Sequence, residues 1–262
     1  MLWIYSMPLW LLAASTLLVT LVLGLWGVTL VRHKSWMLND EDTGTAAFTH
    51  AFIGVLYAVA LGLMVVGVQG AYSHVESVVM REANLAGDLY RDAEGLADPV
   101  RSHVQSLTRQ YIDSVIDVEW AKVSRGERSE ETWYIIDELL RTIVTYKPVD
   151  DAELVVFAEV LAGVNEILDQ RRERLHLGNV GVGFVTWTVV LLGALITIGI
   201  AWFYNTRSAR AHYWLVGAMS AMFGLMIFLI IAMDYPLRGD YSVQPDVFRE
   251  VRENLDRWDQ GL

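Results

Sequence analysis

The chain has 262 residues, 54% of them hydrophobic, and a formal net charge of −11. Its mean hydropathy is positive, which is high for a soluble domain and ordinary for a protein partly embedded in lipid. The lack of cysteine excludes disulfides, cysteine-ligated zinc and thiol catalysis. The acidic balance argues against a nucleic-acid partner, because binding to phosphates needs clustered lysine and arginine.

Four long stretches are apolar and free of charge. Each has roughly 20 to 25 residues, enough at a rise of about 1.5 Å per residue to cross a hydrocarbon core of about 30 Å. Tryptophan and tyrosine flank the stretches, as they do at a lipid–water boundary. The sequence therefore predicts an all-α, multi-pass membrane protein with four transmembrane helices, at residues 8–31, 46–69, 180–204 and 213–233.

The region between the second and third stretches is predicted to be a helical extramembrane domain. Apolar residues recur there at helical spacing, without the period-two alternation of strands. Asp98–Pro99, Ser129 and Asp150 are typical helix starts, and the helix of the second stretch is expected to continue out of the membrane. The predicted domains are a first transmembrane pair (1–70), an acidic helical domain (71–179), a second transmembrane pair (180–233) and a C-terminal tail (234–262).

The charges of the chain are unevenly placed. Residues 71–178 contain 21 acidic and 12 basic residues, a net charge of −9. This is typical of a solvated helical surface, or of an acidic antechamber that raises the local concentration of cations above a pore. The short connections carry basic residues, which favours the cytoplasm for both connections and an extracytoplasmic location for the helical domain. These basic residues are Arg32, Lys34, Arg207 and Arg210.

No pattern in the sequence predicts catalysis. The six histidines are scattered and lack the spacing of metal ligands, and no nucleotide-binding motif leads from a strand into a helix. We therefore expect no enzyme activity, no cofactor and no metal site.

Small residues recur at every fourth position of the second stretch, and polar residues lie near one of its ends. A row of small residues lets another helix approach closely, which drives association in lipid. Two interpretations are open: tight packing within one subunit, or a symmetric central passage formed with other copies. The second interpretation gives six pore-lining candidates, which are Thr49, His50, Gly54, Tyr57, Ala58 and Gly62.

The fourth stretch ends in Asp234, followed by Pro236 and Gly239. Because a residue before proline is biased away from the α conformation, the helix should end near Asp234. A carboxylate at a helix C-terminus faces the negative end of the dipole at a cost of roughly 0.3–1 kcal/mol, and the cost of an unpaired charge grows near hydrocarbon. We therefore expect Asp234 to pair with an arginine, chosen from Arg171, Arg172, Arg174 and Arg238.

The order of these elements and four segments resemble the bestrophin-like integral membrane proteins of bacteria. The segments are AFIGVLYAVALGLMVVGVQ (51–69), VEW (118–120), NEILDQRRERL (165–175) and DYPLRGDYSVQPDVF (234–248). The resemblance runs from about residue 8 to residue 248. It implies a bacterial inner-membrane protein and a likeness to bestrophins, which are pentameric chloride channels with four membrane helices per subunit.

We expect an oligomeric ion channel or channel-like protein, a homo-oligomer in the lipid bilayer with ions as its cargo. The resemblance suggests anions and the acidic domain suggests cations, so selectivity stays open. The alternative is a membrane-anchored ligand sensor or scaffold that acts through a partner, since a helical bundle held between spans also suits the reception of a small molecule.

Overall fold

The computed structural model describes residues 4, 5 and 7–260, and no strand occurs among them. The prediction of an all-α fold is confirmed. These residues form two compact units, here called the membrane unit and the helical unit. The membrane unit holds the described residues up to Gly70 with Gly181–Tyr235 and Gly239–Tyr241, and the helical unit holds Ala71–Val180, Pro236–Arg238 and the described residues from Ser242 onward.

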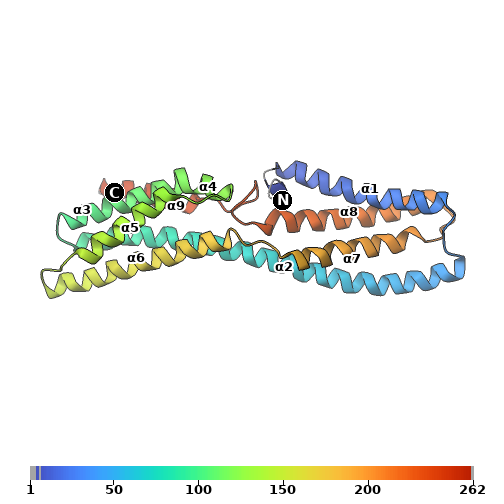
Figure 1. Ribbon diagram of the computed structural model, residues 1–262, viewed down its shortest axis with the longest axis horizontal. Coiled ribbons are helices and arrows are strands. Elements are labelled where there is room, and N and C mark those ends of the chain that lie inside the picture. Colours follow the sequence, from blue (N-terminus) through green and yellow to red (C-terminus); the bar gives the residue numbers. More distant parts are fainter. Residues whose placement is uncertain (1–3, 6, 261–262) are drawn as a thin grey trace. The chain divides into compact units, whose positions relative to one another are not determined.

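Four helices of the described chain are long and apolar enough to cross a membrane, as predicted. They are α1 (Leu9–His33), α2 (Asp40–Asp92), α7 (Phe184–Trp202) and α8 (Ala209–Asp234), all visible in Figure 1. Helix α2 runs for 53 residues without a break, so the second span continues beyond the membrane segment as expected. Helix α7 begins later than predicted, because residues 180–183 precede it without helical structure.

Helix α1 packs against α8 more extensively than against α7. Glycines allow the close approach at two successive turns. A Cβ atom on Gly24 would lie 2.1 Å from the Ser220 hydroxyl of α8, and one on Gly27 would lie 2.0 Å from the Trp202 ring of α7. Neither position has room for a side chain, so the three helices depend on these glycines for their spacing.

We expect Gly27→Leu to lower the melting temperature of the protein in detergent, because the new side chain would overlap the Trp202 ring. Overpacking of this kind typically costs about 1–3 kcal/mol. Gly44→Leu is the matched control, since no other part of the described chain lies within 4 Å of a Cβ placed at Gly44. Thermal unfolding followed by fluorescence compares the two variants. Equal melting temperatures would contradict the close approach.

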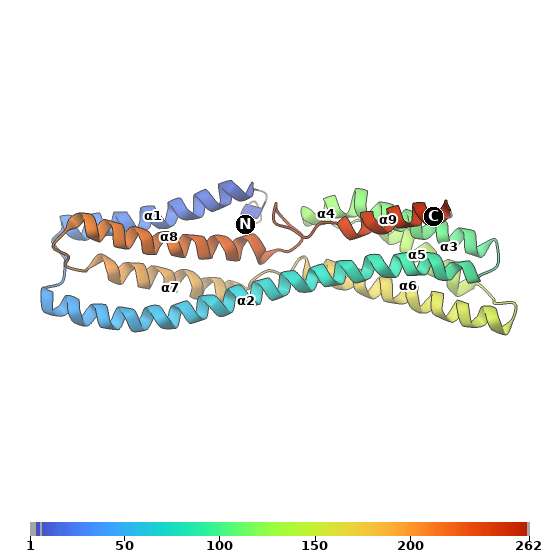
Figure 2. The ribbon, with the colours of Figure 1, turned by 180° about the vertical axis from the view of Figure 1, so that it is seen from behind.

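The helical unit surrounds a core of apolar side chains, which includes Val104, Ile136, Leu139, Ile167 and Phe248. Figures 1 and 2 show α6 running alongside the second part of α2. The elements beyond α2 are η2 (Ala93–Gly95), α3 (Val100–Ser114), the π-helical turn η3 (Val115–Glu119), α4 (Trp120–Ser124), α5 (Glu130–Thr145), α6 (Asp151–Leu177) and α9 (Asp246–Asp259).

Two of the predicted helix starts are confirmed. The Ser129 hydroxyl accepts a hydrogen bond from the Thr132 N–H at the start of α5, and the Asp150 carboxylate accepts one from the Glu153 N–H at the start of α6. The third start differs by one residue. Helix α3 begins at Val100, and the Asp98 carboxylate accepts a hydrogen bond from the Ser102 hydroxyl at 2.6 Å.

Glu153 connects two loops of the helical unit through its carboxylate. It accepts hydrogen bonds from the Tyr146 hydroxyl, from the Val149 N–H at 2.7 Å and from the Ala97 N–H at 2.8 Å. These donors favour the ionised form and lower the pKa of Glu153 below its ordinary value, the Tyr146 hydroxyl contributing most.

We expect the stabilisation from Glu153 to depend on pH. Because the pKa is lower in the folded state, the contribution is present above the unfolded pKa of about 4.3 and is lost as the pH falls through the folded pKa. The difference in free energy of unfolding between the wild type and Glu153→Gln should therefore shrink between neutral pH and about pH 3. Chemical denaturation across this range measures the difference, with the exposed Glu138→Gln as control. A constant difference would contradict the assignment.

Candidate functional site

Helix α2 turns one face of its membrane segment toward the rest of the membrane unit. Tyr57, Leu61 and Val68 are buried on this face. The Tyr57 hydroxyl donates to the backbone carbonyl of Val190 in α7 at 2.5 Å, and its ring meets Phe223 of α8 edge to face. Tyr57 is thereby held inside the subunit, between α7 and α8.

The side of α2 next to this buried face is open. No other part of the described chain lies within 4 Å of a Cβ placed at Gly54 or at Gly62, and Ala58 between them is exposed. Large apolar residues beside this row, such as Val59 and Leu63, are also mostly exposed. The small residues therefore do not serve to pack α2 within its own subunit, which was one of the two interpretations of the row.

Two further candidates lie near the start of the membrane segment of α2. Thr49 is exposed, and its hydroxyl donates to the backbone carbonyl of Thr45 at 3.1 Å. The Nδ1 atom of His50 lies 2.5 Å from the hydroxyl of Tyr204, just beyond α7. The structure thus brings Thr49, Gly54, Ala58 and Gly62 to exposed or open positions. It holds His50 against Tyr204 and Tyr57 between α7 and α8.

Asp234, the last residue of α8, is buried and accepts three hydrogen bonds within the membrane unit. The donors are the Tyr5 hydroxyl at 2.5 Å, the Val182 N–H at 2.5 Å and the Trp187 indole N–H at 3.3 Å. Among the described residues no arginine pairs with it, so the predicted arginine partner is wrong. Neutral donors stabilise the carboxylate instead, and two of them lie at the entry to α7.

The residues that follow Asp234 make a compact turn. Gly239 has a φ of +82°, and a Cβ atom there would lie 2.9 Å from the Tyr5 carbonyl oxygen, so both conformation and space require glycine. The Asp240 carboxylate accepts the N–H of Leu9, the first residue of α1, at 2.9 Å. Asp234 and Asp240 therefore each accept a backbone N–H at or just before the start of a membrane helix, where a helix dipole favours negative charge.

The four arginines proposed for Asp234 have other partners in the helical unit. Arg172 pairs with Asp169 on the surface of α6. Arg238 donates to the Asn179 side chain at 2.6 Å. Nearby, the Pro236 carbonyl accepts the Val243 N–H at 2.8 Å, which closes the turn on this side. Arg171 and Arg174 belong to a buried cluster that was not predicted from the sequence.

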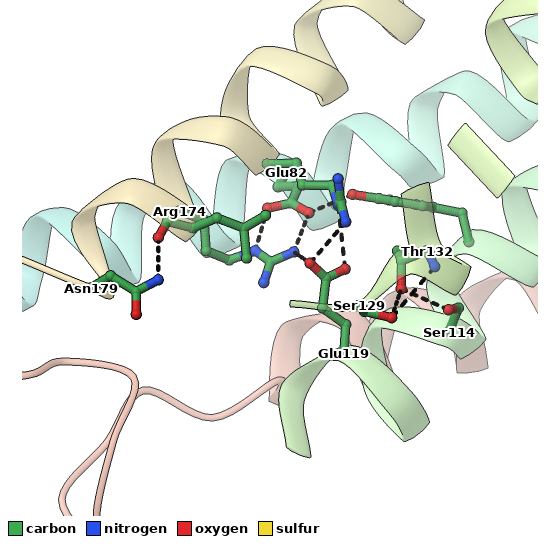
Figure 3. A network of polar contacts seen from close by, with 10 residues as sticks. Glu82, Ser114, Glu119, Ser129, Thr132, Arg174 and Asn179 are labelled. Carbon is green, nitrogen blue, oxygen red and sulfur yellow. Dashed lines mark hydrogen bonds and ion pairs between the residues drawn. The ribbon is translucent and has the colours of Figure 1, made fainter. Parts of the chain in front are cut away.

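The buried charge cluster consists of Glu82, Glu119, Arg171, Arg174 and Tyr111, none of which has meaningful solvent exposure. Arg174 binds Glu82 with two hydrogen bonds, from Nε at 2.6 Å and from Nη2 at 2.9 Å. Arg171 Nη2 lies 3.1 Å from Glu119, and the Tyr111 hydroxyl donates to Glu82 at 2.6 Å. Figure 3 shows Arg174 between the two carboxylates. The two acids and two arginines balance in formal charge.

Aromatic rings beside the cluster stabilise its two positive charges. The guanidinium of Arg171 stacks over Trp133 at 4.1 Å and that of Arg174 over Trp120 at 5.2 Å. Glu119 comes from η3, the π-helical turn that interrupts the run from α3 to α4. Such a turn adds a residue to the helix and rotates the following side chains, and π-helical turns are frequent at functional sites.

The cluster also changes the protonation behaviour of its members. Desolvation alone would lower the pKa of Arg174, but Glu82 and Glu119 outweigh it and hold the pKa above its ordinary value. Burial, together with the negative charge of Glu82, raises the pKa of Tyr111 well above its usual range. Arg174 therefore stays charged and Tyr111 stays protonated, as the hydrogen bonds require.

A signal for the cluster is present in the sequence. Glu82 lies four residues after Val78 and four before Ala86, on the apolar face of α2. Arg171 likewise lies seven residues after Val164 and four before Leu175. Charged residues at the buried positions of two helices predict a buried ion pair, because an unpaired charge there would be too costly.

We expect Glu82→Gln to lower the free energy of unfolding by about 3–5 kcal/mol, because it leaves the buried charge of Arg174 without its partner. The matched control is Glu166→Gln. This acid pairs with Arg81 between the same two helices but on the surface, where a pair contributes about 0–1 kcal/mol. Denaturant unfolding in detergent measures both variants. Similar losses in the two would contradict the role of the cluster.

Taken together, these features define a four-span helical membrane protein with an extended second helix. A family model described as the bestrophin-like domain matches residues 9–248. The chain therefore belongs to the bestrophin-like family, and the resemblance seen in the sequence is confirmed. No curated protein matches the sequence.

Solved structures share the fold. One variant of a bacterial bestrophin homologue from Klebsiella pneumoniae aligns with a TM-score of 0.68 and 12% identity, covering 93% of this chain and 96% of that one. A second variant of the same homologue aligns with a TM-score of 0.66 and 11% identity, covering 93% of this chain and 97% of that one. A structure described as a membrane protein aligns with a TM-score of 0.67 and 13% identity, covering 91% of this chain and 95% of that one. At such identities the likeness shows the fold alone.

Proposed function

We propose that the chain forms a homo-oligomeric ion channel in the cell membrane, with the open face of α2 lining the pore. The family and the fold support a channel-like protein. The observation that carries the assignment of the pore is the row Gly54, Ala58 and Gly62, since no other part of the described chain lies within 4 Å of a Cβ placed at either glycine.

The chemistry of the row fits a passage between copies of the chain. Small residues let copies of α2 approach closely, which is how helices associate where hydrophobic burial provides no driving force. Thr49 is exposed near one end of the membrane segment, but it lies nine residues before Ala58 and therefore on the other side of α2 from the row. His50 and Tyr57 are held against other helices, so in this proposal they position α2 behind the pore wall.

The proposal includes a location and an orientation. Basic residues in the short connections favour the cytoplasmic side for these connections in a bacterial inner membrane, with the helical unit outside. The acidic surface of residues 71–178, with its net charge of −9, would concentrate cations, whereas the family likeness favours anions. The permeant ion is therefore left for the reversal potential to identify.

We expect Gly62→Trp to abolish most of the ion flux through purified protein in liposomes, because the indole would fill a narrow passage. Potassium and chloride gradients are tested separately, and the reversal potential identifies the ion. Leu225→Trp on the exposed side of α8 is the control and should conduct like the wild type. The mass of each variant in detergent must correspond to the same number of subunits as in the wild type.

Two results would count against the pore. Normal flux in an intact Gly62→Trp oligomer would exclude α2 as the lining. An inserted wild-type oligomer that conducts neither ion would favour the ligand sensor or scaffold.

A further inference from the structure

A groove of about 500 Å³ lies between α1 and α8 of the membrane unit. Its floor is apolar and is formed by Leu21 and Leu25 of α1 with three small residues of α8. The small residues are Gly217, Ala218 and Ala221. The groove is hollow because these residues have little or no side chain. A Cβ atom on Gly217 would just reach Leu25, at 3.6 Å.

Aromatic residues close one end of this groove. Trp214 is 79% exposed, and Tyr213 forms the adjacent wall. The Thr29 hydroxyl donates to the Leu25 carbonyl at 2.8 Å, which leaves the Tyr213 hydroxyl to donate to Thr29 at 3.1 Å. This bond between α1 and α8 fixes the wall. Tryptophan and tyrosine prefer the lipid–water boundary, so this end of the groove lies near the head groups.

A positive charge occupies the same end. Arg210 lines the groove in the first turn of α8 and is exposed. No ion pair of Arg210 occurs within the described part of the chain, in contrast to the paired arginines of the helical unit. An apolar channel that ends in a cation beside boundary aromatics matches the two parts of an anionic lipid.

We propose that this groove is a binding site for an anionic phospholipid. An acyl chain lies along Gly217, Ala218 and Ala221, and the phosphate lies at the Arg210 guanidinium. A zwitterionic lipid would satisfy the apolar floor but gain less from the charge. A second copy of the chain in the groove would have to bring a carboxylate to Arg210.

Native mass spectrometry of the full-length protein tests the site. The protein is purified in detergent with an equimolar mixture of phosphatidylglycerol and phosphatidylcholine, and the lipid retained per subunit is measured. We expect the wild type to retain phosphatidylglycerol in preference. Arg210→Gln should weaken this preference by about fivefold, since a basic residue near anionic lipid contributes about 1 kcal/mol. Arg207→Gln, in the loop just before α8 and outside the groove, should leave the preference unchanged.

A second pair of variants tests the apolar floor. Ala218→Trp should displace the bound lipid by filling the groove, whereas Leu215→Trp, which is exposed and lies outside the groove, should retain it. Equal retention of both lipids by the wild type would overturn the proposal. The proposal would also be overturned if the two arginine variants had equal effects on the lipid preference, or if Ala218→Trp retained the lipid. A disulfide between two copies that each carry Ala218→Cys would likewise overturn it.

Discussion

The paired hydrogen bonds between Arg174 and Glu82 are the interaction on which the helical unit most depends. Both side chains are fully buried, and a buried charge that loses its partner is among the most destabilising defects a protein can have. The bonds join α6 to α2, and Glu119 of η3 brings a third element to the same point.

The membrane unit follows a related rule, in which polar groups near hydrocarbon must be satisfied locally. Asp234 and Asp240 meet this requirement with N–H and O–H donors, among them the N–H of Leu9 at the start of α1 and the N–H of Val182 just before α7. The short segment that ends the fourth span thus serves two helix starts. The positive φ of Gly239 lets the chain turn tightly between the two carboxylates.

Much of the fold could be predicted from the sequence, because span length, apolar periodicity and the caps at Ser129 and Asp150 are local signals. The partner of Asp234 could not be predicted from the sequence. A charge argument favours arginine, whereas Tyr5 and Val182 come from distant parts of the chain that only the fold brings together. The buried charge cluster was missed although Glu82 and Arg171 occupy apolar positions. The role of the open face of α2 could not be decided from the sequence. A row of small residues looks the same whether it packs within one subunit or against another copy.

The central claim, that the open face of α2 lines a pore, is tested most directly by cysteine accessibility, for which the chain is suited because it contains no cysteine. Gly54→Cys, Ala58→Cys and Gly62→Cys would each be treated with a charged thiol reagent that cannot cross the bilayer, while flux is recorded. We expect all three cysteines to react with the reagent and the flux to fall as they do. Cysteines that stay unreactive in a conducting protein, or that react without any change in flux, would contradict it.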